Sequence, residues 1–302
     1  MWISMEYRVK AETVGVLAER LLRRKKTGRV RLLLSNTAYI DVDGRPVILT
    51  RSRERSPLTI NLEPLQTEPL HGLIKYDTPA ILEGETLQVG ELSVSLTAAE
   101  SYYTRLPGNC RISVMSKDLV KSAFLLSCFY QVEAGRRLVL AEAPQLAEFI
   151  KGVVIPYVDS RCSAIVDFRC YFSLLGLGEG FTPSGDDFLS GFLATLNTYS
   201  RFSVTLPVEE ILGRTSWASG MLLYYFHRGF YGEGLSRLLR SLAGEGSLFD
   251  ALLYMVGLGH TSGIDTSLGV VIAAAMLVEE RERDHTLVEV ISRINPSLVE
   301  SG

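Results

Sequence analysis

A glycine-rich stretch from Gly176 to Asp187 holds the residues of this sequence best suited to chemistry. It reads GLGEGFTPSGDD, with four glycines in its first ten positions, and it leads into an apolar segment with helical periodicity. Glycine lets backbone N–H groups approach a ligand closely, and a helix N-terminus favours negative charge. The pattern therefore predicts a ligand-binding loop ahead of a helix. The alternative is a well-capped helix start, because Ser184 and first-turn aspartates also stabilise a helix by themselves.

A second stretch, GLGHTSGID from Gly257 to Asp265, repeats this order of residue types 78 positions later. With Pro183 as the single extra residue, the two stretches align through the aspartate and on to a glycine one helical turn beyond it. In a helix these residues share one face, which is small enough for two helices to approach closely. We therefore predict two loop–helix units related by a pseudo-twofold axis, with both loops and their aspartates in one pocket.

The residue types at this pocket limit its ligand. Backbone amides at two helix N-termini favour an anion such as phosphate, carboxylate or carbamoyl phosphate, whereas three aspartates repel a bare anion. Mg²⁺ bridging the aspartates to the ligand, or an amide or ammonium group on the ligand, satisfies both conditions. No lysine follows the glycines, so the loop is not of the Walker A type.

These considerations predict Asp186, Asp187 and Asp265 as catalytic residues that also hold Mg²⁺, and His260 in the second loop as a proton-transfer residue. The predicted ligand-binding residues are Gly178, Gly180, Thr182, Ser184, Gly185, Arg214, Thr215, Ser219, Gly259, Thr261, Ser262 and Gly263. Three of them lie between the loops: Thr215 and Ser219 are spaced to share a helix face, and Arg214 is suited to meet an anion. The alternative for this face is a packing contact between small residues.

The elements that must position these residues form two predicted domains. Residues 1–110 are β-rich, as a barrel or a sandwich, with a leading helix over residues 11–24. Asp43-Gly44 is a strong hairpin signal, and Gly90-Glu91 indicates another tight turn. The predicted strands span residues 29–34, 38–42, 46–50, 58–62, 86–89 and 92–96.

Residues 111–302 form a predicted helical domain that carries both glycine loops, after a linker around residues 107–109. The predicted fold class is therefore α+β. The predicted helices span residues 117–134, 144–155, 159–174, 186–200, 207–228, 233–243, 247–257, 264–281 and 285–293.

Composition excludes several classes of protein. The 302 residues include 31 Lys+Arg and 34 Asp+Glu, a net charge of −3 that argues against a nucleic-acid binder. The longest apolar run near the C-terminus, residues 268–278, is too short to span a bilayer, and the N-terminus has no secretory apolar segment. We expect a cytoplasmic protein without a membrane partner. Only nine Asn and Gln accompany many Arg and Glu, a composition typical of thermophiles.

The four cysteines, Cys110, Cys128, Cys162 and Cys170, show no CxxC spacing. This spacing argues against a zinc site and predicts reduced thiols. If the source is a thermophile, an internal disulfide between two of these cysteines is an alternative even in the cytoplasm.

The run GLGEGFTPSGDDFLSG, from Gly176 to Gly191, resembles the signature of the DUF2877 family, which includes the third subunit of bacterial oxamate carbamoyltransferase. The segment GHTSG with Asp265 is similar to the family's second motif, and the stretch from Arg214 to Ser219 resembles the segment between them. Phe181 departs from the leucine expected in the first motif. The resemblance implies carbamoyl transfer between oxamate, or its carbamoylated form oxalurate, and phosphate. It also implies partner subunits that resemble acyl-CoA-synthetase subunits.

Three hypotheses follow from the sequence. The first is a subunit of a small-molecule enzyme with carbamoyl- or acyl-transfer chemistry, in which the loops hold the ligand and the aspartates hold Mg²⁺ or an amide. The second is a non-catalytic, ligand-sensing subunit, because no strong nucleophile–base pair is visible. The third is purely structural, with the glycines serving helix packing and the aspartates serving as caps. A homo-oligomer stays open under all three.

Overall fold

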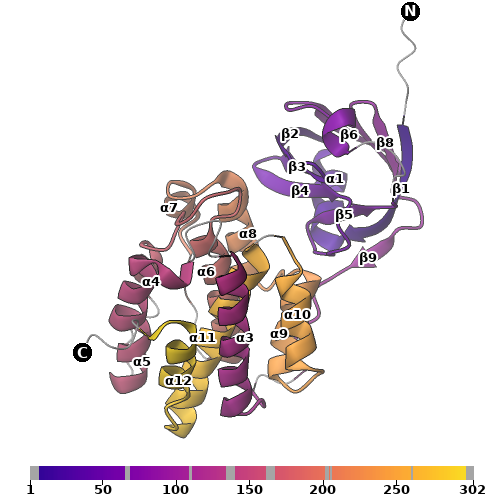
Figure 1. Ribbon diagram of the computed structural model, residues 1–302. Coiled ribbons are helices and arrows are strands. Elements are labelled where there is room, and N and C mark those ends of the chain that lie inside the picture. Colours follow the sequence, from indigo (N-terminus) through magenta and orange to yellow (C-terminus); the bar gives the residue numbers. More distant parts are fainter. Residues whose placement is uncertain are drawn as a thin grey trace, which may run out of the picture. The chain divides into compact units, whose positions relative to one another are not determined.

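The structure is a computed structural model that describes residues 7–64, 69–108, 111–133, 140–160, 167–200, 204, 206–259 and 261–296. The chain divides into two compact units, residues 1–104 with 230–233, and residues 105–229 with 234–302. The first unit is a β-barrel and the second is helical (Figure 1), so the predicted α+β fold class is confirmed.

The first unit is built on eight strands that close into a barrel in the order β5-β4-β3-β2-β6-β7-β8-β1, with β1 pairing back onto β5. A ninth strand, β9, pairs in parallel with the end of β1. The strands are β1 (Tyr7–Gly15), β2 (Thr27–Leu33), β3 (Thr37–Val42), β4 (Arg45–Thr50), β5 (Thr59–Leu62), β6 (Pro79–Glu83), β7 (Thr86–Val89), β8 (Leu92–Ser95) and β9 (Glu100–Tyr102). Two helices accompany them, α1 (Val16–Lys25) and α2 (Leu70–Leu73).

Two predicted turns of the barrel are confirmed. Asp43 and Gly44 connect β3 to β4 with φ values of 59° and 77°, the left-handed pair that a two-residue hairpin requires. Gly90 connects β7 to β8 with a φ of 61°. The paired registers then run without a break through both hairpins, which fixes the inward and outward faces of these strands.

The predicted leading helix over residues 11–24 is wrong in its first part. Residues up to Gly15 belong to β1, whose buried and exposed residues alternate from Arg8 to Thr13 as in a half-buried strand. Helix α1 starts only at Val16, because the carbonyl of Pro57 accepts from the N–H groups of Leu17 and Ala18 at 2.9 and 3.0 Å. Strands β6 and β9 were also absent from the prediction.

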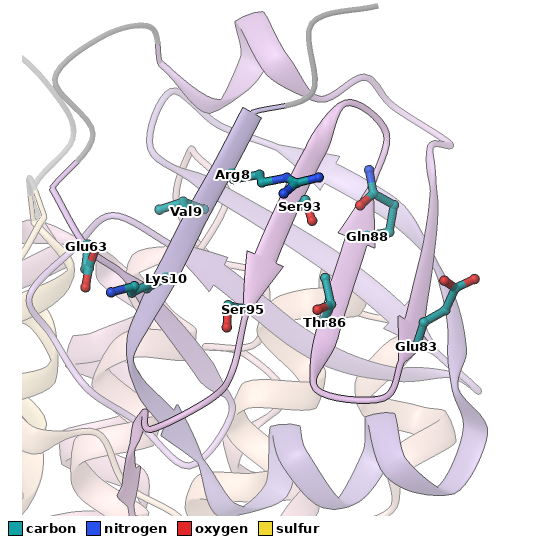
Figure 2. A pocket seen from close by; sticks show the side chains of 9 residues that line it. All are labelled: Arg8, Val9, Lys10, Glu63, Glu83, Thr86, Gln88, Ser93 and Ser95. Atoms are coloured by element: carbon teal, nitrogen blue, oxygen red, sulfur yellow. The ribbon is translucent and has the colours of Figure 1, made fainter.

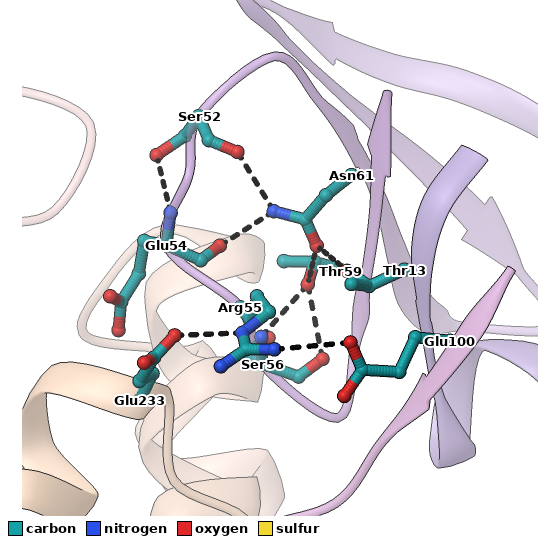
Figure 3. Close-up of polar contacts among 9 residues, drawn as sticks. All are labelled: Thr13, Ser52, Glu54, Arg55, Ser56, Thr59, Asn61, Glu100 and Glu233. Atoms are coloured by element: carbon teal, nitrogen blue, oxygen red, sulfur yellow. Dashed lines mark hydrogen bonds and ion pairs between the residues drawn. The ribbon is translucent and has the colours of Figure 1, made fainter. Parts of the chain in front are cut away.

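A buried polar network at Asn61 ties β1, β5 and the loop before β5 together (Figure 3). The Asn61 amide donates to the carbonyls of Ser52 and Glu54, both at 2.8 Å, and its oxygen accepts from Thr13 and Thr59. All hydrogen-bonding positions of the side chain are used, so Asn61 fixes the loop conformation without an unpaired buried group.

The second unit is organised around the helix pair α6 (Ser184–Tyr199) and α11 (Ser262–Glu282), which share the most extensive contact among the described elements. The surrounding helices are α3 (Ser116–Glu133), α4 (Pro144–Phe149), α5 (Ile155–Ser160), α7 (Val208–Leu212), α8 (Trp217–His227), α9 (Glu233–Leu242), α10 (Leu248–Val256) and α12 (Thr286–Ile294). A π-helical turn, η2 (Ile150–Val154), joins α4 to α5, and 3₁₀ turns lie at η1 (Leu140–Glu142) and η4 (Phe168–Tyr171).

Helix α11 alone, among the described helices, is long and apolar enough to cross a membrane, but 89% of its apolar window is buried inside the structure. It is therefore the core helix of this unit, as expected for its apolar run. Phe188 and Phe192 on α6 stack on each other, and both meet Phe149 on α4 edge to face, which fills the space beside the pair.

Two predicted helices are wrong in detail. The predicted helix 159–174 is replaced, in its described part after residue 166, by the 3₁₀ turn η4 and further turns up to Gly176. The predicted helix 207–228 is broken between α7 and α8 at residues 213–216, where Ser216 caps α8 by accepting from the N–H of Ser219. The hydroxyl of Ser216 also donates to the carbonyl of Phe181, so this break lies against the first glycine loop.

Candidate functional site: two helix starts and their aspartates

The two glycine loops meet in the structure. The hydroxyls of Thr182 and Ser262, 80 residues apart, lie within hydrogen-bonding distance of each other at 2.9 Å. Left-handed glycines turn the chain before each helix: Gly178 has a φ of 104° and Gly259 a φ of 69°. The repeat seen in the sequence therefore corresponds to two adjacent loop–helix units.

Reciprocal glycines allow the two helices to touch. A Cβ atom on Gly191 would lie 2.0 Å from the carbonyl oxygen of Thr266, and one on Gly269 would lie 2.0 Å from that of Phe188. Each repeat glycine thus faces the backbone of the other unit. This close crossing brings the first turns of α6 and α11 together, as a pseudo-twofold arrangement requires.

The roles predicted for Gly185 and Gly263 need correction. Their N–H groups, expected to hold an anion, already donate to the carbonyls of Leu177 and Leu258 at 2.9 and 3.2 Å. A Cβ on Gly185 would lie 1.9 Å from the carbonyl oxygen of Leu174, and one on Gly263 would similarly collide with backbone. Both glycines therefore serve close packing of each loop on its helix, and their amides are not free for a ligand.

Asp186 holds the first loop together. Its Oδ1 accepts from the N–H of Gly176 at 2.8 Å, and its Oδ2 accepts from the hydroxyls of Thr215 and, at 2.7 Å, Ser219. Burial raises the pKa of Asp186, and these three donors oppose the rise. Thr215 and Ser219 therefore meet at Asp186 rather than on one face of a helix, and both oxygens of this carboxylate are occupied.

Asp187 and Asp265 are arranged differently. Each has a buried Oδ2 atom with no hydrogen-bond partner among the residues that the structure describes. The other oxygen of Asp265 accepts from the hydroxyl of Tyr130 at 2.6 Å. Unpaired buried carboxylate oxygens are costly, so these two atoms are the acceptors at this place best suited to a hydrogen-bond donor or a cation.

The electrostatics of this pair follow from its burial. Asp265 is fully buried, and burial raises its pKa to about 6 against the opposing effect of the hydroxyls of Tyr130, Ser184 and Thr261. Burial raises the pKa of Asp187 well above its usual range; the hydroxyl of Ser262 opposes this, and the charge of Asp265 adds to it. The serine that starts each helix thus acts on the aspartate of the other helix.

Helix α10 shows what ordinary capping looks like at the same spacing. Its Ser247 and Asp250 repeat the S-x-x-D pattern of both units, and Ser247 accepts from the N–H of Asp250 in a normal N-cap. In α6 and α11 the residues at the N-cap, Pro183 and Thr261, make no side-chain cap bond. Capping alone therefore does not account for the aspartates of the two units.

The remaining predicted residues lie in several places. The guanidinium of Arg214 stacks on the ring of Phe172 at 3.9 Å, and Arg214 is exposed. Gly180 has open space where a side chain would be, and His260 lies outside the described residues. Of the cysteines, Cys128 and Cys170 are free thiols, whereas Cys110 and Cys162 are outside the described part of the chain.

The fit of Mg²⁺ to these residues rests on two carboxylates. Asp186 uses both of its oxygens for hydrogen bonds, which leaves Asp187 and Asp265 to face an ion. Over the described ranges, no group of three Asp, Glu, His or Cys side chains is placed to hold a metal. An ion here would have to take its remaining ligands from the substrate and water, as Mg²⁺ often does.

A separate hollow lies on the outer face of the barrel (Figure 2). Two cross-strand rows line it, Arg8–Ser93–Gln88 and Lys10–Ser95–Thr86, with each row crossing β1, β8 and β7. Along β1 the exposed Arg8 and Lys10 alternate with the buried Val9 and Ala11, so the hollow lies on the polar outer face that a barrel strand pattern produces.

Sequence reasoning missed Tyr130, the donor to Asp265. It lies on α3, 135 residues before its partner, and no local motif surrounds it. Only the packing of α3 against α11 reveals it. The N–H of Gly176, which holds Asp186, was also missed, although its glycine opens the first motif.

Comparison with known families supports the resemblance inferred from these motifs. A family model described as oxamate carbamoyltransferase subunit AllH matches residues 174–274, about a third of the chain. The matched stretch contains both glycine loops, all of α6 and the first part of α11. The predicted link to this family is confirmed over that stretch. No solved structure matches the chain.

Proposed function

We propose that this chain, whose residues 174–274 match an oxamate carbamoyltransferase subunit, binds a small amide- or carboxylate-bearing substrate where α6 and α11 start. In this proposal it is one subunit of an enzyme for carbamoyl or acyl transfer. The observation that carries it is the pair of buried, unpartnered Oδ2 atoms of Asp187 and Asp265 beside the joined loops.

The three aspartates have different proposed roles, because their contacts differ. Asp186 accepts from three donors and stabilises the conformation of the first loop. Asp187 and Asp265 contact the ligand, and the positive ends of two helices favour the ligand's negative group. Electrostatic stabilisation by groups fixed before the reaction is then the main expected contribution to rate. His260 remains a proposed proton-transfer residue. Two ligand groups are proposed for the aspartates, an amide that donates to them directly or a phosphate that Mg²⁺ bridges to them.

The resemblance also supports proposals about partners. Oxalurate cleavage by phosphate yields oxamate and carbamoyl phosphate, and the partner subunits would bind or activate one of these reactants. We place this assembly in the cytoplasm. The two cross-strand rows on the barrel offer a polar surface for such partners or for a second copy of the chain.

A non-catalytic, ligand-sensing subunit is the second candidate. The described groups at the site are hydroxyls and carboxylates, without a paired nucleophile and base. The thiol of Cys170 is a poor nucleophile, because burial raises its pKa to about 12. This candidate predicts that the chain binds ligand while the assembled enzyme turns over normally without that binding.

The first test is a thermal-shift measurement on the full chain with phosphate, carbamoyl phosphate and oxamate, each with and without Mg²⁺. A ligand at 100 times its Kd adds about 2.7 kcal/mol of stability, which corresponds to a rise in Tm of roughly 5–11 °C for a unit of this size. Asp187→Asn is expected to abolish the shift. Asp250→Asn, at the equivalent position of the ordinary cap on α10, is expected to leave it unchanged.

The second test uses the complex reconstituted with its partner subunits and measures phosphate-dependent cleavage of oxalurate. Loss of turnover in Asp187→Asn, with turnover retained in Asp250→Asn, supports the catalytic proposal. Retained turnover in both variants supports the sensing subunit instead. A wild-type chain that no probe stabilises contradicts both.

A further inference from the structure

The two unpartnered carboxylate oxygens belong to two helices that touch each other. Asp187 lies in the first turn of α6 and Asp265 in the first turn of α11, and both Oδ2 atoms are buried. We propose that this pair recognises the –NH₂ group of a terminal carbamoyl or primary amide. Each Oδ2 accepts a hydrogen bond from one of the two N–H groups. This inference rests on the proposed function and deepens it, because it assigns the residues that select the substrate.

The first step is that the ligand must bring donors. The described protein supplies a hydrogen to Oδ1 of Asp265 through Tyr130, but it supplies none to either Oδ2 atom. A ligand group that can only accept hydrogen bonds would leave both atoms unpaired and add a repulsive lone pair beside them. A carboxylate or phosphate oxygen in direct contact with the two Oδ2 atoms is therefore disfavoured, although it suits the helix N-termini.

The second step is that the donor is neutral. The positive ends of α6 and α11 both point to this region and disfavour a cation. Asp186, the third acidic side chain, has its oxygens occupied by Gly176, Thr215 and Ser219 and adds no ligand for a metal ion. A neutral N–H donor satisfies the carboxylates without opposing the helices.

The third step is the number of donors. Two acceptors on two touching helices need two hydrogens, and a primary amide nitrogen supplies both from one small group in a fixed plane. A secondary amide carries one, so it would leave one of the two Oδ2 atoms unpaired. The pair should therefore discriminate between –NH₂ and –NHCH₃, because an unpaired buried group costs more than a lost contact.

The test is isothermal titration calorimetry on the full chain in the presence of EDTA, with oxamate, N-methyloxamate and oxalate as probes. We expect wild-type protein to bind oxamate at least about tenfold more tightly than N-methyloxamate or oxalate. Asp187→Asn and Asp265→Asn each replace an acceptor by a donor. Both substitutions should weaken oxamate binding by about tenfold or more and strengthen oxalate binding. The preference for oxamate over oxalate should therefore disappear or invert.

Asp250→Asn is the matched control, since Asp250 has the same spacing from a helix-starting serine, but it is exposed and only its backbone N–H donates to the capping Ser247. If the two substitutions weaken the binding of all three probes equally, their effect is a general structural defect. Unchanged affinity ratios would overturn the inference. Equal wild-type affinity for oxamate and N-methyloxamate would also overturn it, as would binding that requires Mg²⁺ in place of EDTA. These results leave the proposed function standing, whereas the absence of binding by any probe, with or without Mg²⁺, contradicts the proposed function itself.

Discussion

Replacement of Asp265 by Asn should stabilise the unliganded protein at neutral and alkaline pH. The carboxylate is fully buried, one of its oxygens has no described partner, and burial raises its pKa from 3.8 to about 6. The folded state therefore binds this proton more tightly than the unfolded state does. Between about pH 4 and pH 6 the stability contributed by this group falls as pH rises, and above that range its full cost is present.

The size of the effect follows from the pKa values. A rise from 3.8 to about 6 corresponds to about 3 kcal/mol of lost stability at pH 8, and to almost none at pH 4. Asparagine keeps an acceptor for Tyr130 and removes the charge. Because the charge of Asp265 also raises the pKa of Asp187, its removal relieves Asp187 as well, with the same sign.

The assay is unfolding by heat or urea across pH 4 to pH 8, compared between wild type and Asp265→Asn. For a unit of roughly 190 residues, 3 kcal/mol corresponds to a Tm increase of about 6–12 °C at pH 8, shrinking towards zero at pH 4. Asp250→Asn should change stability by less than about 1 kcal/mol at either pH. A destabilised Asp265→Asn protein at pH 8, or a difference that does not vary with pH, would refute the reasoning.

Three further changes test other parts of the structure. Gly191→Ala should lower the free energy of urea unfolding by about 3 kcal/mol or more, because its Cβ would lie 2.0 Å from the Thr266 carbonyl oxygen. Gly152→Ala, with open space around the glycine, should change that free energy by less than about 1 kcal/mol. Asn61→Ala should cost about 2–4 kcal/mol in the barrel's unfolding transition, since four hydrogen bonds are lost, and an unchanged midpoint would contradict that role. Cys170 should react with iodoacetamide at pH 8 at least about 100-fold more slowly than free cysteine, because a pKa of about 12 leaves little thiolate; mass spectrometry showing rapid labelling would count against its burial.

Much of the fold was predictable where local signals are strong. Asp43-Gly44 specifies a hairpin by its backbone preference alone, and the structure has one there. The repeat of two glycine loops predicted adjacent helices, because small residues at equal spacing permit close approach. Strand β6 gave no comparable signal, because it has only five residues, PAILE, and begins with a proline.

The errors occurred where long-range contacts override local periodicity. Residues 11–15 fit a helical pattern, but they pair with β5 and β9 as part of β1. Helix α1 begins after them, where the Pro57 carbonyl accepts from its first N–H groups. In the site, sequence spacing identified all three aspartates but treated them as equivalent. Their different roles depend on donors from Gly176, Thr215 and Tyr130, which only the tertiary structure brings to them.

The bond from Tyr130 to Asp265 has a consequence for how the protein can be divided. The stretch that matches the family ends at residue 274 and begins at residue 174, so it contains Asp265 but not Tyr130. A fragment limited to that stretch would bury the Asp265 carboxylate without its 2.6 Å donor. The smallest autonomous piece that keeps the site must therefore extend back through α3, and the recognisable motif region is shorter than the folding unit on which it depends.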